Sequence, residues 1–392
     1  MLIQIILFLA LGIFAGIITG LIPGIHINLV GIFIVSIYSS LLINQVYFTV
    51  FITAMAITHT FIDFIPSVFL GCPDTDTELS VLPGHELLKK GYGYEAIILT
   101  AYGSIAAIGI LMVIAIPAIL IISKTYETIQ TFIPFLLIAV SLILIFLEKK
   151  KTTALFVFLL TGMLGITVLN LEINQPLLPL LTGLFGSSML IMSIKNKIEI
   201  SEQKITRPII DMKKPLLGAL IASPICSFLP GMGSGQAAII GNTISPTDQK
   251  GFLVLLGATN TLVMGFSFIS LYIISKTRTG AAVAIKEIVG TLSIELLILI
   301  LIVSLITGII AFFLTKFLAK KASQIIKKIN YVKLSITTLI FLGLINFFIV
   351  GIFGVLVLIV STLTGIYCIN LNVRRANMMG CLLIPTIILY LF

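Results

Sequence analysis

Long unbroken apolar runs recur along the whole of this 392-residue chain. A helix needs about 20 residues to cross the hydrocarbon core of a bilayer, and most of these runs are long enough. Hydrophobic residues make up 59% of the chain and charged residues only 10%, against about 25% charged residues in soluble domains. Because backbone amides in lipid must be bonded within their own segment, the runs predict helices. The sequence therefore predicts an all-α polytopic membrane protein.

The apolar runs fall into two series with the same number of segments. The first series lies near 2–20, 29–43, 46–70, 96–123, 131–147, 153–169 and 176–194, and the second near 215–229, 232–243, 252–275, 288–315, 334–349, 351–368 and 377–391. We therefore predict an internal duplication, with a first membrane repeat at 1–194, a cytoplasmic linker at 195–214 and a second repeat at 215–392.

Two short matches support this duplication. GIITGLIPGIHIN at 16–28 aligns with SPICSFLPGMGSG at 223–235, so both halves place Pro-Gly after an apolar run. Further along each half, ITHTF at 57–61 aligns with ATNTL at 258–262. The histidine of the first motif and the asparagine of the second are therefore expected to be equivalent.

The basic residues predict the orientation of the chain in the membrane. If each Pro-Gly segment is a re-entrant hairpin, all but four of the 24 Lys and Arg residues fall in loops on one side. Those loops are 72–95, 148–152, 195–214, 244–251, 316–333 and 371–376, and the exceptions are Lys124, Lys276, Arg278 and Lys286. The basic side is expected to be cytoplasmic. The fold class is then two inverted-topology repeats, each with one re-entrant Pro-Gly hairpin and about five spanning helices.

The two Pro-Gly breaks are candidates for a substrate site. Proline removes an amide and glycine accepts positive φ, so each segment is expected to unwind and restart as a helix with free N–H groups. Such a helix start favours a carboxylate or phosphate. The candidate substrate-binding residues are Pro23, Gly24, His26, Asn28, Pro230, Gly231, Gly233, Ser234, Gln236, Asn260, Lys276 and Arg278. The alternative is a proline-kinked helix packed on small residues.

Acidic residues within apolar sequence are candidates for ion coupling. His59 and Asp63 lie one helical turn apart, and Asp74, Thr75, Asp76 and Thr77 offer hard oxygen ligands suited to sodium or protons. The alternatives are a hydrogen-bonded pair that tightens helix packing, a metal pair at His59 and Asp63, and a solvated turn at 74–77. The four cysteines show no CxxC spacing, which favours structural roles, and we predict no bound metal and no cofactor.

These elements resemble the large membrane subunit of tripartite tricarboxylate transporters, the TctA family. The resemblance rests on GIITGLIPGIHIN, its echo SFLPGMGSGQ, and PSVFLGCPDTDTELSVLPGHELLKKGYGYEAIILTAYGS, and it spans nearly the whole chain. It implies ion-coupled movement of an organic anion across the cytoplasmic membrane, with Pro23, Gly24, Pro230 and Gly231 as hairpin-break positions.

The chain also departs from the family pattern. His26 and Asn28 stand where the family usually has glycine and small residues, and Pro73-Asp74 stands where it usually has Pro-Gly. The chain is also shorter than the usual large subunit. These departures favour a branch that works without the extracytoplasmic binding protein and the small membrane subunit. The alternatives are that the chain does associate with these two partners, or that it forms a homodimer.

We therefore interpret the chain as a secondary active transporter of a small organic anion such as a carboxylate, coupled to protons or sodium by alternating access. One alternative is a translocase of a lipid-linked polyprenyl phosphate. Another is an intramembrane enzyme using His26, His59 and Asp63, but neither a nucleophile nor a full metal set accompanies them, so we predict no enzyme.

No Walker A sequence is present, which disfavours direct ATP coupling. The basic residues follow membrane topology and do not indicate nucleic acid.

Overall fold

The computed structural model describes residues 2–22, 27–38, 44–70, 76–173, 175–195, 201–228, 233–275, 277, 279–326 and 331–391. All regular structure over these residues is helical, which confirms the predicted class. The first half contains α1 (Leu2–Leu21), α2 (Ile27–Tyr38), α3 (Gln45–Ile62), α4 (Phe64–Leu70), η1 (Glu78–Ser80), α5 (Val81–Lys89), α6 (Gly93–Phe146), α7 (Lys151–Leu169), α8 (Leu177–Leu181), η2 (Thr182–Ser187) and α9 (Ser188–Lys195). The second contains α10 (Lys213–Phe228), α11 (Ser234–Ile244), α12 (Gln249–Ile274), α13 (Gly280–Val289), α14 (Ile294–Ile326), α15 (Tyr331–Val350), α16 (Ile352–Asn370), η3 (Arg375–Met379) and α17 (Gly380–Leu391).

Several helices are long and apolar enough to cross a membrane. By length and composition there are seven such stretches among the described residues: Leu2–Leu21, Gln45–Leu70, Gly93–Lys124, Lys151–Leu169, Gln249–Ile274, Ile294–Ile326 and Ile352–Asn370. Shorter apolar helices occupy Leu137–Phe146, Leu177–Met192, Ser335–Val350 and Arg375–Leu391. The chain is thus a multi-pass membrane protein, and the expectation of five full spans in each half is met only in part.

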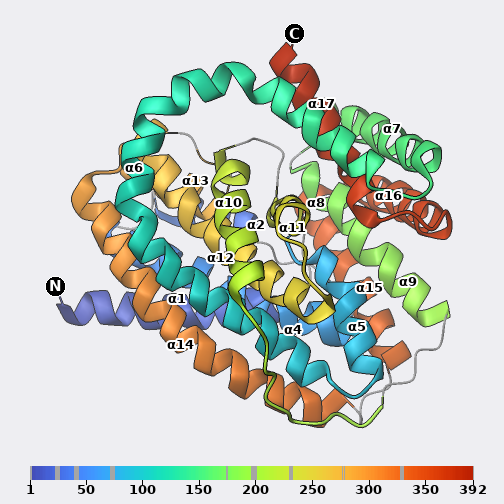
Figure 1. Ribbon diagram of the computed structural model, residues 1–392, viewed down its shortest axis with the longest axis horizontal. Helices are drawn as coiled ribbons and strands as arrows, with labels where there is room; N and C mark the ends of the chain where they lie inside the picture. The colour runs from blue at the N-terminus through green and yellow to red at the C-terminus, as the bar shows by residue number, and fades with distance from the viewer. Residues whose placement is uncertain are drawn as a thin grey trace.

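Helix α6 joins two segments that the sequence predicts to be separate. It runs for 54 residues with Pro117 and Pro134 inside it, a length of about 80 Å at 1.5 Å per residue. The predicted break after Lys124 is wrong, because residues 124–131 contain neither glycine nor proline to stop a helix. Figure 1 shows α6 running up one side of the molecule and bending across the top toward α7 and α17. Prolines on either side of the polar stretch are the usual cause of such bends.

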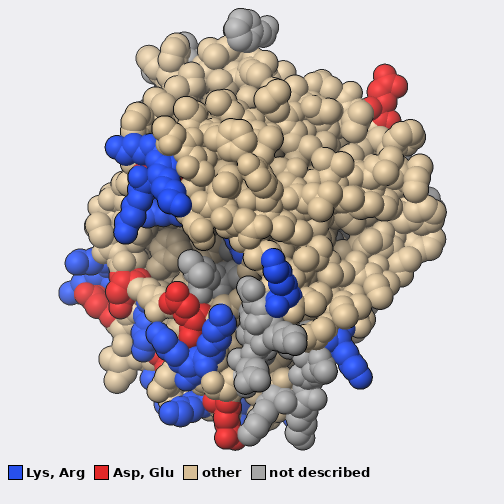
Figure 2. Space-filling model, turned by 90° about the vertical axis from the view of Figure 1, so that its right-hand side faces the viewer, with Lys and Arg blue, Asp and Glu red and all other residues tan. Residues whose placement is uncertain are grey.

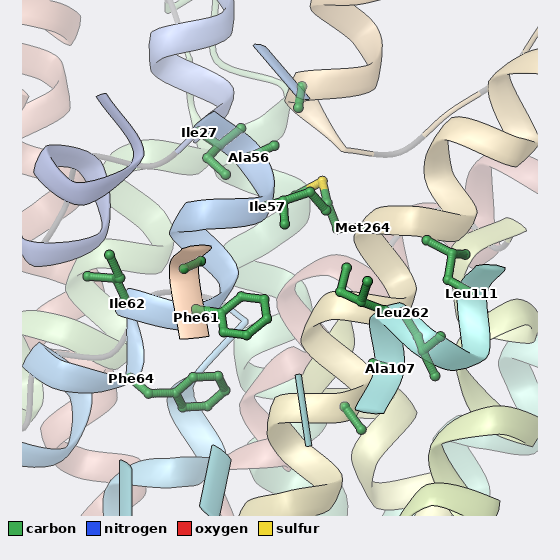
Figure 3. Packing of buried hydrophobic residues seen from close by; sticks show 14 of the residues in the cluster. Ile27, Ala56, Ile57, Phe61, Ile62, Phe64, Ala107, Leu111, Leu262 and Met264 are labelled. Carbon is green, nitrogen blue, oxygen red and sulfur yellow. The ribbon is translucent and has the colours of Figure 1, made fainter. Parts of the chain in front are cut away.

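The core is centred on α3, α6 and α12. The two most thoroughly buried candidate spans are those that contain α3 and α12. Figure 3 shows Ile57 and Phe61 of α3 lying toward Met264 and Leu262 of α12, with Leu111 of α6 beside them. The apolar packing of the molecule therefore converges where the two halves of the chain cross.

Glycines allow α6 and α12 to approach closely. A Cβ at Gly103 would lie 2.0 Å from the carbonyl oxygen of Val254, and one at Gly257 would lie 2.0 Å from that of Thr100. Ser104 donates a hydrogen bond to the carbonyl oxygen of Gly257 at 3.0 Å. Small residues at helix crossings are the usual means of close packing in membranes.

Helices of the two halves are paired reciprocally. Helix α3 packs along α14, and α12 packs along α6; likewise α7 packs along α17, and α16 packs along η2. At the outer pairs, a Cβ on Gly165 of α7 would meet the backbone of Cys381, and one on Gly365 of α16 would meet that of Leu184. Each half is therefore completed by helices of the other.

Charged side chains gather on one part of the molecule. Figure 2 shows most of the visible Lys, Arg, Asp and Glu residues in the lower part and along the left side of one face, while the upper middle and right are tan apart from one acidic group. Three loops that the sequence predicts on one side meet at Glu95, which pairs with Lys250 and accepts a hydrogen bond from Thr206 at 2.8 Å. Two further loops on that predicted side meet where Arg374 lies 3.4 Å from Glu148.

Candidate functional site

The first polar cluster lies where α3 ends, in the middle of the apolar core. Helix α3 ends at Ile62, and α4 begins at Phe64 with Pro66 in its first turn. Because proline has no N–H, the backbone hydrogen bonds of a helix cannot continue unchanged through this point. The chain turns at Asp63, whose carbonyl oxygen accepts a hydrogen bond from the Ser67 hydroxyl at 2.8 Å.

Asp63 is a carboxylate buried between the two halves. Its side chain is 3% exposed, and its Oδ2 accepts a hydrogen bond from Nδ2 of Asn260 on α12 at 2.8 Å. Nε2 of His59 lies 3.9 Å from the same oxygen, and its Nδ1 lies 3.1 Å from the Thr19 hydroxyl of α1. The arrangement thus links α1, α3 and α12 through one carboxylate and one imidazole. Such a group can take up or release a proton or help to bind a small cation.

The two matched motifs are in direct contact. In the alignment of ITHTF with ATNTL, Thr60 and Thr261 are equivalent, and their hydroxyl oxygens lie 3.2 Å apart. The Asn260 amide also donates to the carbonyl oxygen of Thr60 at 3.4 Å. Equivalent residues that touch one another lie beside any axis that relates the two halves. His59 and Asn260, which the sequence match predicts to be equivalent, therefore lie at one site.

The second polar cluster lies at the amino-terminal end of α11. Oδ1 of Asp76 accepts hydrogen bonds from the Ser234 backbone N–H at 3.2 Å and from its hydroxyl at 3.0 Å. The same hydroxyl lies 2.9 Å from the carbonyl oxygen of Asp76, to which it can donate. Oε1 of Gln236 accepts from the N–H of Gly233 at 2.6 Å, so the Gln236 amide folds back over the start of the helix. Ser234 and Gln236 are each 1% exposed.

The structure brings together some of the predicted site residues. His59, Asp63 and Asn260 form the first cluster, and Asp76, Gly233, Ser234 and Gln236 form the second. Asn28 lies on α2, with only its backbone described. The other predicted residues lie outside the described residues: Pro23, Gly24, His26, Asp74, Thr75, Pro230, Gly231, Lys276 and Arg278.

Hydroxyl side chains were missed by reasoning from the sequence. Thr19 contacts His59, Thr60 contacts Thr261, and the hydroxyl oxygens of Ser67 and Thr77 lie 2.6 Å apart. The threonines of the matched motifs carried a usable signal, because they repeat in both halves. Ser67 carried none, since hydroxyl residues are common in membrane helices, whereas Thr77 belongs to the polar turn at 74–77 that the sequence singles out.

Comparisons of the sequence with known proteins identify the family. An uncharacterized protein of Methanocaldococcus jannaschii is 35% identical over 407 aligned positions, which cover 98% of this chain and 99% of that protein. No solved structure matches the chain. The model of the tripartite tricarboxylate transporter TctA family matches residues 6–380, nearly the whole chain, and confirms the resemblance seen in the sequence. The protein therefore belongs to the tripartite tricarboxylate transporter TctA family.

Proposed function

We propose that the protein is a secondary active transporter that moves a small carboxylate of the tricarboxylate type across the cytoplasmic membrane, driven by protons or sodium. Membership of a transporter family supports transport as the general function. The observation that carries the coupling is the buried Asp63 carboxylate, held by Asn260 where α3 crosses α12. Ionisable groups at membrane depth are costly and persist mainly in ion or substrate pathways.

The coupling cation binds at Asp63 in this proposal. A proton would neutralise the carboxylate directly, and His59 lies close enough to exchange that proton with it. Sodium would use the carboxylate with neighbouring hydroxyl and carbonyl oxygens, the hard ligands that it prefers. Thr60 and Thr261 supply hydroxyl oxygens near the cluster. In either case the cation cancels a charge that would otherwise oppose movement through the low-dielectric core.

The substrate anion binds at the start of α11, where backbone N–H groups point away from the helix. Gly233, Ser234 and Gln236 line this end, and a helix start carries a partial positive charge. From the sequence pattern, we assign Pro23, Gly24, His26 and Asn28 of the first half, and Pro230 and Gly231 of the second, to the same anion site. The charges of Lys276 and Arg278 are proposed to attract the anion, and Asp74, Thr75 and Asp76 are proposed as a second cation position besides Asp63.

Alternating access follows from the relation between the two halves. We propose inverted repeats at 1–194 and 215–392, each with a re-entrant hairpin. The reciprocal pairing of α3 with α14 and α12 with α6 supports this relation, as does the Thr60–Thr261 contact. Transporters with inverted repeats open to either side by rocking one unit against the other.

Uptake by the purified chain in proteoliposomes tests the proposal. Citrate, succinate and inorganic phosphate are supplied with or without inward proton and sodium gradients. We expect uptake of at least one carboxylate, driven by one gradient, without a binding protein or small subunit. Uptake of phosphate alone would instead favour a phosphate translocase, and no gradient dependence would contradict secondary transport.

Asp63→Asn tests the cation site. Asparagine keeps the size and an acceptor for Asn260 but cannot be protonated, so we expect gradient-driven uptake to fall about tenfold or more with little loss of stability. Asp211→Asn, on the exposed linker, removes the same charge and is expected to leave uptake unchanged. Unchanged gradient dependence in Asp63→Asn would contradict the assignment.

A further inference from the structure

The start of α11 already holds a carboxylate, and that carboxylate comes from the other half of the chain. Asp76 lies just before η1, and its Oδ1 accepts from both the backbone N–H and the hydroxyl of Ser234. The two residues are 158 positions apart. In these contacts Asp76 caps α11 as a separate carboxylate ligand would, because charge-assisted bonds from helix N–H groups favour any anion placed there.

A second observation at this helix end is a buried donor that lacks an acceptor. Gln236 is 1% exposed, and its Oε1 is used by the N–H of Gly233. Its Nε2 is buried without a hydrogen-bond partner among the described residues. A buried donor left unsatisfied is costly, so it marks a position where an acceptor oxygen is expected to bind. Asp76 satisfies the Ser234 N–H, but this amide donor is left over.

We propose that the Asp76 carboxylate occupies the binding position of the substrate carboxylate at the start of α11. The substrate displaces Asp76 from this position once a cation has neutralised Asp76. The inference rests on the proposed function and adds how anion and cation binding are linked at that site. With Asp76 charged, an incoming carboxylate meets both a competitor for the same N–H and a like charge within a few ångströms. A proton or sodium ion on Asp76 removes the repulsion and weakens the competing hydrogen bonds.

Few ionisable residues lie on the described elements beside the Asp76 turn. The turn itself continues into η1, which begins with Glu78. Helices α4 and α11, which pack near this turn, contain no ionisable residue. Helix α5 brings His85, Glu86 and Lys89, and α12 brings Lys250 at its start. Lys250 pairs with Glu95, and Glu86 accepts a hydrogen bond from Gln249 at 2.8 Å.

His85 does not interfere near neutral pH. Burial, with the positive charges of Lys89 and Arg375, lowers the pKa of this histidine to about 4. His85 therefore stays neutral between about pH 5.5 and 7.5, because that range lies well above its pKa. A change in anion affinity over this range is thus not expected to come from His85, and comparison with Asp76→Asn isolates the contribution of Asp76.

Citrate binding to the purified full-length protein provides the test. Affinity is measured by isothermal titration at pH 7.5 and 5.5, each with and without sodium, for the wild type and Asp76→Asn. We expect Asp76→Asn to bind citrate about tenfold more tightly than wild type at pH 7.5 without sodium, since the like charge is gone. The ratio of the two affinities is expected to fall when the coupling cation is supplied, on going from pH 7.5 to 5.5 if the cation is a proton, or on adding sodium if it is sodium. Using this ratio removes the contribution of citrate's own protonation.

Asp248→Asn is the matched control. Asp248 accepts a hydrogen bond from the N–H of Gly251 at the start of α12, so the substitution makes the same chemical change at a different helix start. It is expected to leave citrate affinity unchanged. Asp76→Ser provides a second variant that keeps an acceptor for Ser234 if the asparagine protein folds poorly, and it is expected to tighten binding likewise.

The outcomes separate the inference from the proposed function. Equal or weaker citrate binding in both folded Asp76 variants at pH 7.5, with wild-type binding intact, would overturn the internal competitor and leave transport standing. Absence of binding of citrate, succinate and phosphate to folded wild type and variants under all conditions would overturn the anion site and this inference with it.

Discussion

His85 is a buried histidine on α5, outside the candidate spans. Burial is the main cause that lowers its pKa to about 4 from an ordinary 6.5, and the charges of Lys89 and Arg375 add to it. At pH values between about 4 and 6.5, this histidine therefore binds a proton in the unfolded chain but not in the folded protein. The stabilising contribution is fully present above about pH 6.5 and is lost as the pH falls toward 4, by roughly 3 kcal/mol at most.

Substituting His85 with glutamine tests this acid sensitivity. We expect the melting temperature of His85→Gln to fall less than that of wild type between pH 7.5 and 4.5, because glutamine has no proton to gain. The comparison is between the two pH-dependent drops, so a constant loss of stability from the substitution does not matter. An identical drop in both proteins would show that His85 is not responsible.

At the scale of secondary-structure elements, the close crossing of α6 and α12 contributes to the stability of the folded protein. At Gly103, a Cβ would lie 2.0 Å from the backbone oxygen of Val254, and a backbone atom in a packed helix cannot move aside cheaply. Gly109 lies on the same helix, yet a Cβ there would meet nothing within 4 Å. These two glycines provide the same substitution in tight and open surroundings.

We expect Gly103→Ala to destabilise the protein by about 1–3 kcal/mol through overpacking. Gly109→Ala is expected to be neutral or to stabilise by up to about 1 kcal/mol, because alanine favours helix. Thermal unfolding of both variants in the same detergent measures the difference. Equal melting temperatures would mean that the helices separate without cost, contrary to the close approach seen here.

At the scale of the whole molecule, the reciprocal pairing of helices and the gathered charges predict which loops face the same side of the membrane. Lys149, Lys204 and Lys286 are exposed, and the first two belong to loops on the predicted cytoplasmic side. Single cysteines at these positions, in a background without the native cysteines, are labelled with a membrane-impermeant reagent in right-side-out and inverted vesicles. We expect Lys149→Cys and Lys204→Cys to react from one side and Lys286→Cys from the other. Reaction of all three from one side, or of Lys149→Cys and Lys204→Cys from opposite sides, would contradict the predicted topology.

The sequence by itself determined the helical class, the membrane environment and the family. These follow from local rules, because apolar length and the need to pair backbone groups in lipid act within each segment. The buried Asp63 was also predictable, since an acid within apolar sequence is unusual wherever the chain folds. The continuity of α6 was not predicted, because a polar stretch that contains no helix breaker can belong either to a loop or to a bent helix.

Only the tertiary structure decided which residues meet. Asp63 and Asn260 are 197 positions apart and Asp76 and Ser234 are 158 apart, so neither contact follows from local spacing. Both arise because helices of each half pack on helices of the other, which depends on close approach at particular glycines such as Gly103. The sequence supplies the ionisable and polar groups, and packing between the halves determines which of these groups contact one another.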